Sequence, residues 1–313
     1  MNRMKTAVLV SLMTVACALH PQAVDRKPGS GMRIASHYKS IQAAHDALPA
    51  TGGVIFVPAG TSLAQGLVIS KPVHLIFDLG IFSYSGSGDA IHINSGVRGV
   101  IIEGSGGAEF NSPDSGSAIV VVDPAGKGLN AVANPSIVIR NIAFTGPGRG
   151  SGTGIYLTGN GFLLENTQTT SFGGDGTVID GKRGNSNSGV LIRARSYRNG
   201  GDGFYTFGSD ANLISWIGTD SLANGRKNYL FEDAMCQSFL GAHSQPSSDK
   251  NSIEFIDSSA NWGSLYIEPV KPFKAACIEF DGKSKNNNLF LMNCRSVKDA
   301  GIHNRWELAA PDR

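Results

Sequence analysis

The sequence has few charged residues and few aromatic ones. Charged residues make up 17% of the 313 residues, aromatic residues make up 8%, and the formal net charge is only +2. So small a net charge excludes strong electrostatic attraction to nucleic acid or to a membrane surface. No phosphate-binding loop, dinucleotide fingerprint or zinc motif occurs. Glycine is abundant instead, with 40 residues, and this composition is typical of a β-rich chain with many turns.

Long apolar runs are also missing. The run Thr6–Val15 is shorter than the roughly 20 residues that a membrane-spanning helix needs. It follows Arg3 and Lys5, and this order predicts a secretory signal peptide over residues 1–18. Cleavage before Cys17, with lipid attached to that cysteine, is the alternative. We therefore expect a secreted or periplasmic protein, or an outer-membrane lipoprotein.

Cysteine is scarce. Beyond the signal peptide the sequence contains only Cys236, Cys277 and Cys294, and their spacing is not that of a metal site. Three cysteines allow at most one disulfide, in an oxidising compartment. We expect buried, small side chains rather than a disulfide.

Short apolar runs, such as "VHLIFDLG", "SIVIRNIAF" and "NYLFED", fill most of the remaining chain and are bounded by Gly, Asn, Ser or Asp. The turn Gly-Gly-Asp-Gly occurs twice, with aspartates at Asp175 and Asp202, and an echo follows around Lys227. These positions lie 27 and 25 residues apart. A repeat of this length with several short strands predicts an all-β solenoid, the parallel β-helix, in which stacked coils share one core.

Side-chain alternation predicts which residues of "GVLIRARS" face the core. Successive side chains of a strand point to opposite faces, and the arginines must face water. Arg193 and Arg195 are therefore expected outside together with Leu191, and Val190, Ile192 and Ala194 inside.

A helix is predicted near the start of the solenoid. In "YKSIQAAHDALPATGGVIFVPAG", Ile41, Ala44 and Leu48 share one helical face, and Pro49 ends the helix. A solenoid must cover the open edge and core of its first coil. We expect this helix to be that cap.

The same stretch, over residues 38–60, resembles the opening of pectate-lyase-superfamily proteins, the pectin-lyase-like right-handed parallel β-helix group. More narrowly it resembles the rhamnogalacturonase/epimerase-like branch, which includes some phage tailspikes. The resemblance implies a right-handed β-helix that contacts acidic or complex polysaccharide outside the cytoplasm. From the residues themselves we expect a flexible leader over residues 19–36, and from the repeat a β-helix domain over 37–313. The Asn-Thr-Asp, Asp-Asp and Gly-His-Gly signatures of the polygalacturonase group are absent, and so is the Asp-Pro-His-Glu signature of alginate epimerases. The catalytic mechanism of neither group therefore transfers directly to this sequence.

Asp175 and Asp202 are the candidate catalytic residues. Equivalent positions of neighbouring coils lie about 4.8 Å apart, so the two carboxyls and Lys227 are expected to form one column. One carboxyl would then act as acid and the other as base or nucleophile. The alternative is that each aspartate only binds the backbone of its own turn. Asp180 and Asp210, near the same strand, are weaker candidates.

A basic and aromatic group is the candidate binding surface. Guanidinium groups bind carboxylates in a bidentate way, and aromatic rings stack on sugars. The predicted substrate-binding residues are Arg193, Arg195, Arg198, Tyr197, Tyr205 and Lys227. The alternative is an ordinary solvated face. If the protein is a lyase, Ca²⁺ held by Asp is a further expectation; no other cofactor and no dedicated metal site are predicted.

Histidine and tryptophan give weaker signals. His243, in a stretch expected to be a loop, has the chemistry of an acid or base near neutral pH. For it, as for His74, His92 and His303, we favour a structural role. Trp216 is expected to face outward.

These patterns lead to one functional hypothesis and two alternatives. We expect an exported enzyme that cleaves an acidic polysaccharide in a groove along the β-helix, as a lyase or a glycoside hydrolase. The alternatives are a non-catalytic glycan-binding surface module and a tailspike-like structural solenoid. The partner expected in each case is polysaccharide rather than nucleic acid, and the oligomeric state is left open.

Overall fold

The structure is a computed structural model that describes residues 31–111, 116–121, 137–246, 252–268 and 276–309. Short strands dominate these residues. The described residues also contain one α-helix, α1 (Ile41–Asp46), and one 3-10 helix, η1 (Ala35–His37).

The first of two sheets has 16 strands. They are β1 (Met32–Ile34), β2 (Gly53–Val57), β4 (Val73–Phe77), β5 (Ile81–Ser83), β7 (Val100–Asn111), β9 (Ile137–Thr145), β11 (Phe162–Glu165), β12 (Gln168–Thr170), β14 (Val190–Ile192), β15 (Arg195–Tyr197), β17 (Ser215–Ile217), β18 (Asp220–Leu222), β20 (Ser238–Gln245), β22 (Trp262–Ile267), β24 (Asn288–Met292) and β26 (Arg305–Leu308).

The second sheet has 10 strands. They are β3 (Leu67–Ile69), β6 (Ile91–Ile93), β8 (Ile119–Val121), β10 (Ile155–Leu157), β13 (Thr177–Asp180), β16 (Phe204–Phe207), β19 (Tyr229–Glu232), β21 (Ile253–Ile256), β23 (Ile278–Phe280) and β25 (Val297–Asp299).

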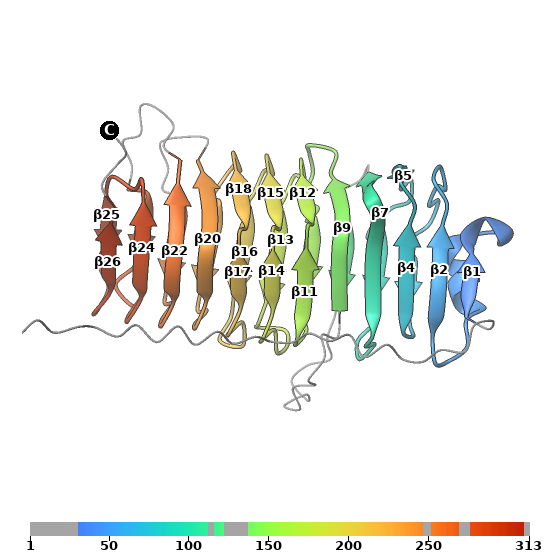
Figure 1. Cartoon of the computed structure of the whole chain (residues 1–313), viewed down its shortest axis with the longest axis horizontal. Helices are drawn as coiled ribbons and strands as arrows, with labels where there is room; N and C mark the ends of the chain where they lie inside the picture. Colours follow the sequence, from blue (N-terminus) through green and yellow to red (C-terminus); the bar gives the residue numbers. More distant parts are fainter. Residues whose placement is uncertain (1–30, 112–115, 122–136, 247–251, 269–275, 310–313) are drawn as a thin grey trace, which may run out of the picture. The chain divides into compact units, whose positions relative to one another are not determined.

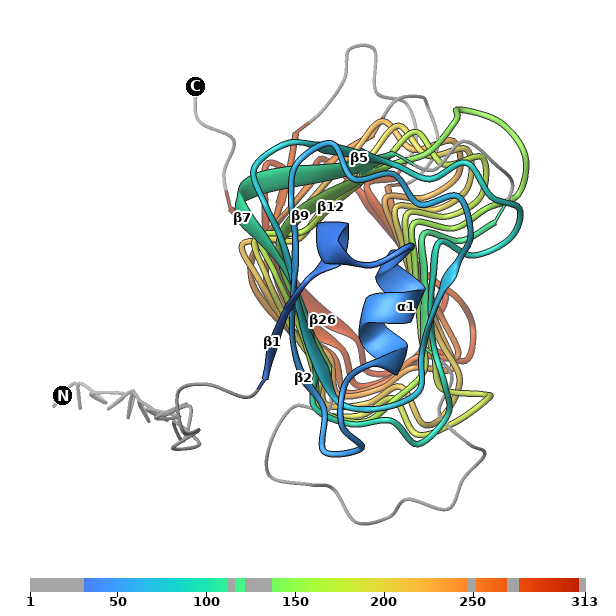
Figure 2. The same ribbon diagram turned by 90° about the vertical axis from the view of Figure 1, so that its right-hand side faces the viewer.

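The chain winds between these sheets coil by coil, and the described strands pair in parallel throughout. Successive coils lie side by side in chain order (Figure 1), and seen from one end they enclose a common interior (Figure 2). The predicted fold is confirmed: the protein is a right-handed parallel β-helix.

The first sheet bends once in most coils, so the β-helix has three faces. In Figure 1, β12, β15 and β18 stand in line above β11, β14 and β17. The residues at this bend have positive φ angles and follow one another in register. They are Asn141 (φ 54), Asn166 (φ 49), Arg193 (φ 50), Gly218 (φ 55) and Gly241 (φ 66).

The helix α1 covers the first coil, as predicted. Ile41, Ala44 and Leu48 are buried, and Figure 2 shows α1 lying across the end of the coil stack. The Gln42 side chain bonds the edge strand β3: its Oε1 accepts from the Val68 N–H (2.7 Å) and its Nε2 donates to the Val68 carbonyl (3.2 Å). One amide side chain thus takes the place of a neighbouring strand.

One interior position changes its chemistry along the stack. Side chains at this position are in register from β5 to β22, are buried, and change from aromatic to hydroxyl-bearing and back to apolar. In chain order they are Phe82, Phe110, Phe144, Thr169, Ser196, Ser221, Ser244 and Ile267.

The predicted facing of β14 is wrong. Leu191 is fully buried, while Val190 and Ile192 face outward and are half-buried. The arginines are outside as expected, but Arg193 has a left-handed conformation (φ 50). Two consecutive residues, Ile192 and Arg193, point outward at the bend. The inward–outward alternation of side chains is therefore interrupted there, and the facing of residues before the bend cannot be deduced from that of residues after it.

Trp216 was predicted to face outward and is instead fully buried. The reason is the same, since Leu213 occupies another corner with φ 55 and is 61% exposed. Ile214 and Trp216 then point inward. The Trp216 Nε1–H donates to the Gln237 side-chain oxygen (3.0 Å).

The cysteines also differ from expectation. Cys277 and Cys294 form a disulfide, and Cys236 is free. The two bonded residues are 17 positions apart in the chain, which periodicity alone does not reveal as a contact. Burial of Cys277 and Cys294 is as predicted.

A strand lies before residue 37. The strand β1 pairs with β2 and lies inside the range 19–36 that the sequence assigns to a flexible leader. The signal peptide over 1–18 and the lipidation of Cys17 lie outside the described residues and stay predictions.

Candidate functional site

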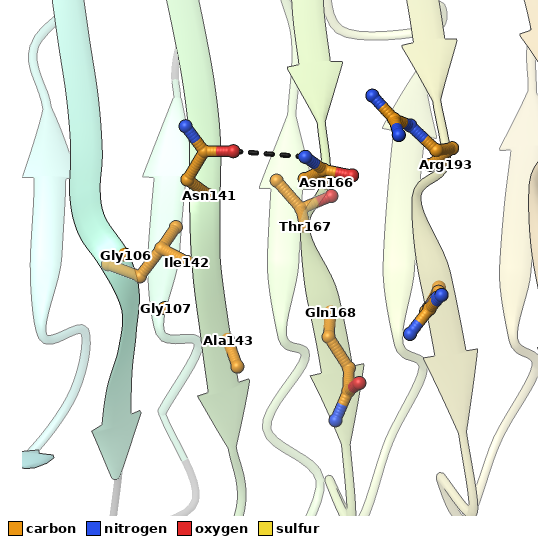
Figure 3. Close-up of a pocket in the computed structure, with 10 residues that line it drawn as sticks. Gly106, Gly107, Asn141, Ile142, Ala143, Asn166, Thr167, Gln168 and Arg193 are labelled. Atoms are coloured by element: carbon orange, nitrogen blue, oxygen red, sulfur yellow. Dashed lines mark hydrogen bonds between the residues drawn. The ribbon is translucent and has the colours of Figure 1, made fainter. Parts of the chain in front are cut away.

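An open pocket of about 530 Å³ lies on the outer surface at the bend of the first sheet. Its lining includes Asn141, Asn166, Gln168 and both predicted arginines, Arg193 and Arg195. Figure 3 shows Asn141 and Asn166 joined across neighbouring strands by a hydrogen bond (3.1 Å), with Arg193 next in line. Arg193 and Arg195 are both exposed and both line this pocket, so the sequence prediction that they share an outer face is confirmed.

A polar row continues from the pocket along the solenoid. Arg195 (β15), Asp220 (β18), His243 (β20) and Tyr266 (β22) occupy the same outward position on four neighbouring strands. His243 Nδ1 is 2.7 Å from Asp220 Oδ1, and its ring centroid is 5.3 Å from that of Tyr266. His243 was expected in a loop; it lies in β20, and the strand fixes its direction.

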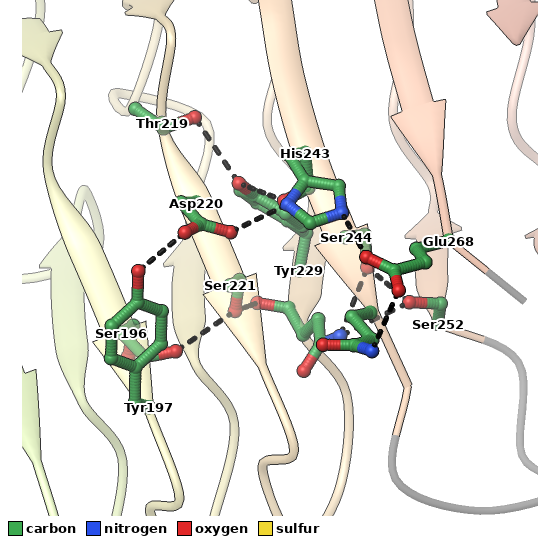
Figure 4. Close-up of polar contacts among 12 residues, drawn as sticks. Ser196, Tyr197, Thr219, Asp220, Ser221, Tyr229, His243, Ser244, Ser252 and Glu268 are labelled. Atoms are coloured by element: carbon green, nitrogen blue, oxygen red, sulfur yellow. Dashed lines mark hydrogen bonds and ion pairs between the residues drawn. The ribbon is translucent and has the colours of Figure 1, made fainter. Parts of the chain in front are cut away.

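Two further side chains complete this cluster, as Figure 4 shows. The Tyr197 phenol donates to Asp220 Oδ2, and Glu268 Oε2 lies 3.5 Å from His243 Nε2. The imidazole is therefore held between two carboxylates. Its side chain is 25% exposed and that of Glu268 is 48% exposed, so Glu268 covers Nε2 from the solvent side.

The protonation states in the cluster follow from its contacts. Burial favours the neutral form of Asp220, but the hydrogen bonds from His243 and Tyr197 outweigh it and hold the pKa of Asp220 below its usual value. An ionised Asp220 is only an acceptor, so the proton of this bond is on His243 Nδ1. Burial and then Asp220 raise the pKa of Tyr197, so its phenol keeps its proton at neutral pH.

The two predicted catalytic aspartates form the expected column with Lys227. Asp175 Oδ1 accepts from the Asp202 N–H (2.7 Å), and Asp202 Oδ1 accepts from the Lys227 N–H (2.8 Å). Each carboxylate thus bonds the equivalent residue of the next coil. This ladder gives both aspartates a structural task at the corner; their catalytic role stays a prediction.

Asp202 has an unusual environment. Its side chain is fully buried, and Oδ2 lies 3.2 Å from a guanidinium nitrogen of Arg226 without a hydrogen bond. Burial raises the pKa of Asp202 to about 6, against the opposing effects of the Lys227 N–H and Arg226. Asp180 is also buried and accepts from the Lys182 N–H (2.7 Å).

The structure divides the predicted binding residues between two faces. Arg193, Arg195 and Tyr197 lie on the bent first sheet. Tyr205 lies on β16 of the second sheet, where its phenol donates to Glu232. Lys227, near the start of β19, has its Nζ 2.9 Å from Glu254 Oε2. Sequence proximity suggested one group, but the corner that holds Asp202 turns the chain between them.

Arg198 and Asp210 are exposed at corners. Arg198 has a positive φ of 53 and extends the charged surface beyond Tyr197. Asp210 follows β16 on the opposite side of the coil from Arg198. Neither residue lies in the row that carries Asp220 and His243.

Sequence reasoning missed Asp220 and Glu268. The signal was available, because Asp220 follows Arg195 by 25 residues and precedes His243 by 23, which are coil spacings. The repeat that the sequence marks most clearly is the glycine-rich corner. Arg195, Asp220 and His243 repeat at coil spacings along the strands, where no shared motif surrounds them.

No group of three or more His, Cys, Asp or Glu side chains is placed to hold a metal ion among the residues that the structure describes. Asp220 and Glu268 both face His243, an arrangement that differs from a calcium cage of oxygen ligands. The Ca²⁺ expectation for a lyase stays a prediction. Within the same residues, no helix has the length and apolar character to cross a bilayer.

Known structures share this fold. The chain is similar to tailspike protein 2 from Escherichia coli O157:H7 bacteriophage CAB120, with a TM-score of 0.56 and 11% sequence identity over 86% of this chain and 39% of the tailspike. It is also similar to the A-module of the mannuronan C-5 epimerase AlgE4 from Azotobacter vinelandii, with a TM-score of 0.49 and 12% identity over 86% and 92% of the two chains. No protein family matches the sequence, and neither does any curated protein.

This chain therefore spans about two fifths of the tailspike. At this identity the similarity shows the fold alone. The class of protein that the structure defines is therefore the right-handed parallel β-helix, with no assignment to a family.

Proposed function

We propose that the protein is an exported enzyme that cleaves an acidic polysaccharide by β-elimination in the groove formed by the pocket and the polar row. The observation that carries the proposal is that Arg195, Tyr197, Asp220 and His243 lie together on three neighbouring strands of an open face. These residues supply a cation, an acid and an oriented base.

The chemistry assigns one task to each group. Arg195, with Arg193 beside the pocket, binds the uronate carboxylate and stabilises the negative charge that develops on it. His243 takes the proton from the carbon next to that carboxylate through Nε2, once substrate displaces Glu268. The electron pair forms a carbon–carbon double bond, the bond to the glycosidic oxygen breaks, and the Tyr197 phenol protonates that oxygen. Asp220 holds the imidazole and the phenol in place.

Hydrolysis fits this face less well. A glycoside hydrolase needs two carboxyl groups on opposite sides of the sugar, about 5 to 9.5 Å apart. Asp220 and Glu268 instead face one imidazole between them. Asp175 and Asp202 remain the alternative pair, but both bind backbone at the corner, and Asp202 is buried.

A non-catalytic glycan-binding module or a tailspike-like solenoid is the second candidate. The similarity to a phage tailspike favours it. Export fits both candidates, because the predicted signal peptide agrees with a disulfide of the kind that persists in oxidising compartments.

One experiment separates these functions. The purified protein is incubated with a panel of uronic-acid polymers while ultraviolet absorbance of unsaturated products and reducing ends are followed together. Elimination makes both signals rise in step, and Arg195→Ala abolishes both. Reducing ends without absorbance would instead show hydrolysis, and binding with neither signal would show a module.

A further inference from the structure

Four exposed apolar side chains surround one small residue at the C-terminal side of the polar row. Ser264 lies outward in the middle of β22, between Leu240 of β20 and Phe290 of β24. Trp262 and Tyr266 point outward from the same strand, two residues before and after it. We call Leu240, Trp262, Ser264, Tyr266 and Phe290 the aromatic cup.

The cup is open to solvent. Leu240 is 65% exposed and Trp262 is 59% exposed, while Tyr266 and Phe290 are each 40% exposed. Ser264 forms a low floor, and its Oγ accepts from the Gly241 N–H (3.1 Å), which leaves its own proton free to donate. A clustered exposed apolar surface of this kind marks a binding site more often than an isolated exposed side chain does.

The cup continues the candidate groove. Tyr266 belongs to the same row as Arg195, Asp220 and His243, and its ring lies against that of His243. Three strand spacings separate Arg195 from Tyr266, which is about 14 Å along the solenoid. A polysaccharide bound over Arg195 and His243 would therefore place a later sugar over the cup.

The charges beside the cup differ from those of the pocket. The pocket end carries Arg193 and Arg195. Beside the cup, Phe290 pairs with Glu307, while Arg305, two residues earlier on the same strand, pairs with Asn288 in the row of Trp262. Glu268 lies two residues beyond Tyr266 on the same edge. Glu307 and Glu268 place negative charge on the Phe290 and Tyr266 side of the cup, which disfavours a uronate there. A neutral sugar ring can stack its C–H face on Trp262 or Tyr266 and accept a hydrogen bond from Ser264.

We propose that the aromatic cup is a subsite for a neutral sugar, so that the substrate is a mixed polysaccharide of uronic acid and neutral sugars rather than a homopolymer of uronic acid. This inference rests on the proposed function for the direction of the bound chain, but binding at the cup does not require cleavage.

Tryptophan fluorescence tests the cup without any turnover. The chain has three tryptophans; Trp216 is fully buried, and Trp306→Phe removes the other exposed one. In that variant, quenching by acrylamide reports on Trp262. The probes are cello-oligosaccharides (neutral), oligogalacturonates (acidic) and hyaluronan oligosaccharides (alternating uronic acid and neutral sugar).

We expect the neutral or the mixed probe to protect Trp262 from quenching more than the oligogalacturonate does. Trp262→Ala should weaken binding of the protecting probe about tenfold, the loss that removal of one stacked ring causes. The matched control is Leu213→Ala, which removes an equally exposed apolar side chain at another corner and should leave affinity unchanged. Equal protection by oligogalacturonate, or protection by none of the three probes, overturns the proposal.

Two further outcomes separate the cup from the proposed function. Cleavage of a uronic polymer with unchanged affinity and rate in Trp262→Ala would keep the enzyme and reject the subsite. Protection of Trp262 without cleavage would keep the subsite and reject the enzyme. Analytical sedimentation of the wild type and of Trp262→Ala is the final control. Self-association that Trp262→Ala abolishes would identify the cup as a protein interface and overturn its assignment to sugar.

Discussion

The N-terminal coils and the central coils fill the same interior position in different ways. In the N-terminal coils it holds phenylalanine, and the rings of Phe110 and Phe144 are 6.0 Å apart. In the central coils it holds hydroxyl groups with specific partners. Ser196 Oγ donates to the Gly203 carbonyl (2.7 Å), and Ser221 Oγ donates to the Asn228 carbonyl (2.9 Å).

The outer surface changes at the same place. Outside the phenylalanines, the row that leads to Arg195 holds Ile81, Glu109 and Ala143. Outside the serines, it holds Arg195, Asp220 and His243. Packed rings tolerate small shifts, whereas hydrogen bonds are directional. We infer that the hydroxyl-lined coils fix the backbone of β15 and β18 more closely than ring packing would, under the side chains that need a defined geometry.

The largest expected effect is loss of a ring from the N-terminal column. Phe110→Ala should destabilise the protein by about 3–5 kcal/mol, because it removes apolar contact and leaves a cavity. Ser196→Ala in the central column should cost only about 1–2 kcal/mol, since it leaves polar partners unbonded but little empty space. Thermal unfolding of both variants measures the difference. Equal losses would mean that the two columns stabilise the solenoid in the same way.

The second largest expected effect is on the rate of cleavage, and it compares the outer surfaces of the central and the N-terminal coils. His243→Gln should reduce the rate of cleavage on the order of a few hundredfold, because the proposed base is lost while the fold is kept. The control is His74→Gln in the N-terminal coils, where His74 bonds Glu103 (2.9 Å) away from the groove. Steady-state rates on the best polymer measure both variants. A similar rate for the two would exclude His243 as the base.

A buried amide next to the serines should have an intermediate effect. Asn199 Oδ1 accepts from the Phe172 N–H (3.0 Å), and its Nδ2 donates to Ser196 Oγ (3.0 Å). Asn199→Ala should cost about 2–3 kcal/mol, because it leaves buried polar groups without partners. Amide hydrogen exchange should accelerate around Phe172 and β15. An unchanged exchange pattern there would contradict the inference that these buried hydrogen bonds fix the backbone of β15.

The smallest effect is a pH dependence at the corner between the two sheets. The pKa of Asp202 is raised to about 6 in the folded protein, above its value of 3.8 in a model peptide. The folded state therefore binds more protons between about pH 4 and 6, and the stability from this group falls as pH rises through that range. Asp202→Asn keeps an oxygen for the Lys227 N–H and removes the charge.

We expect Asp202→Asn to gain about 1–2 kcal/mol over the wild type as pH rises from 5 to 8. Melting temperatures of both proteins across that range measure it. The same variant tests the alternative catalytic pair, since abolished turnover with an intact fold would assign catalysis to Asp175 and Asp202. Parallel pH profiles would show that Asp202 does not titrate as its burial implies.

The fold could be predicted from the sequence because its determinants are local and repeated. The glycine-rich corners fix where coils turn, and the spacing of Asp175, Asp202 and Lys227 gave their contacts correctly. The cap was predictable too, because Ile41, Ala44 and Leu48 form one apolar face.

The site was predicted only in part, because alternation fails at the bends. Arg193 was placed correctly, but its left-handed conformation reversed the facing of Leu191. Trp216 was misplaced for the same reason at Leu213. Asp220 has no motif around it, and its importance comes only from the strands on either side. Disulfide pairing depends on the stacking of two particular corners, which spacing does not reveal.

The column of left-handed residues at the bend has an evolutionary consequence. Since each coil from β9 to β20 carries its own bend residue, a duplicated segment of about 25 residues could enter this part of the stack without disturbing its neighbours. Each insertion would lengthen the candidate groove by one strand spacing, about 4.8 Å, and leave the cluster around His243 unchanged. The length of such a solenoid can therefore change only in whole coils.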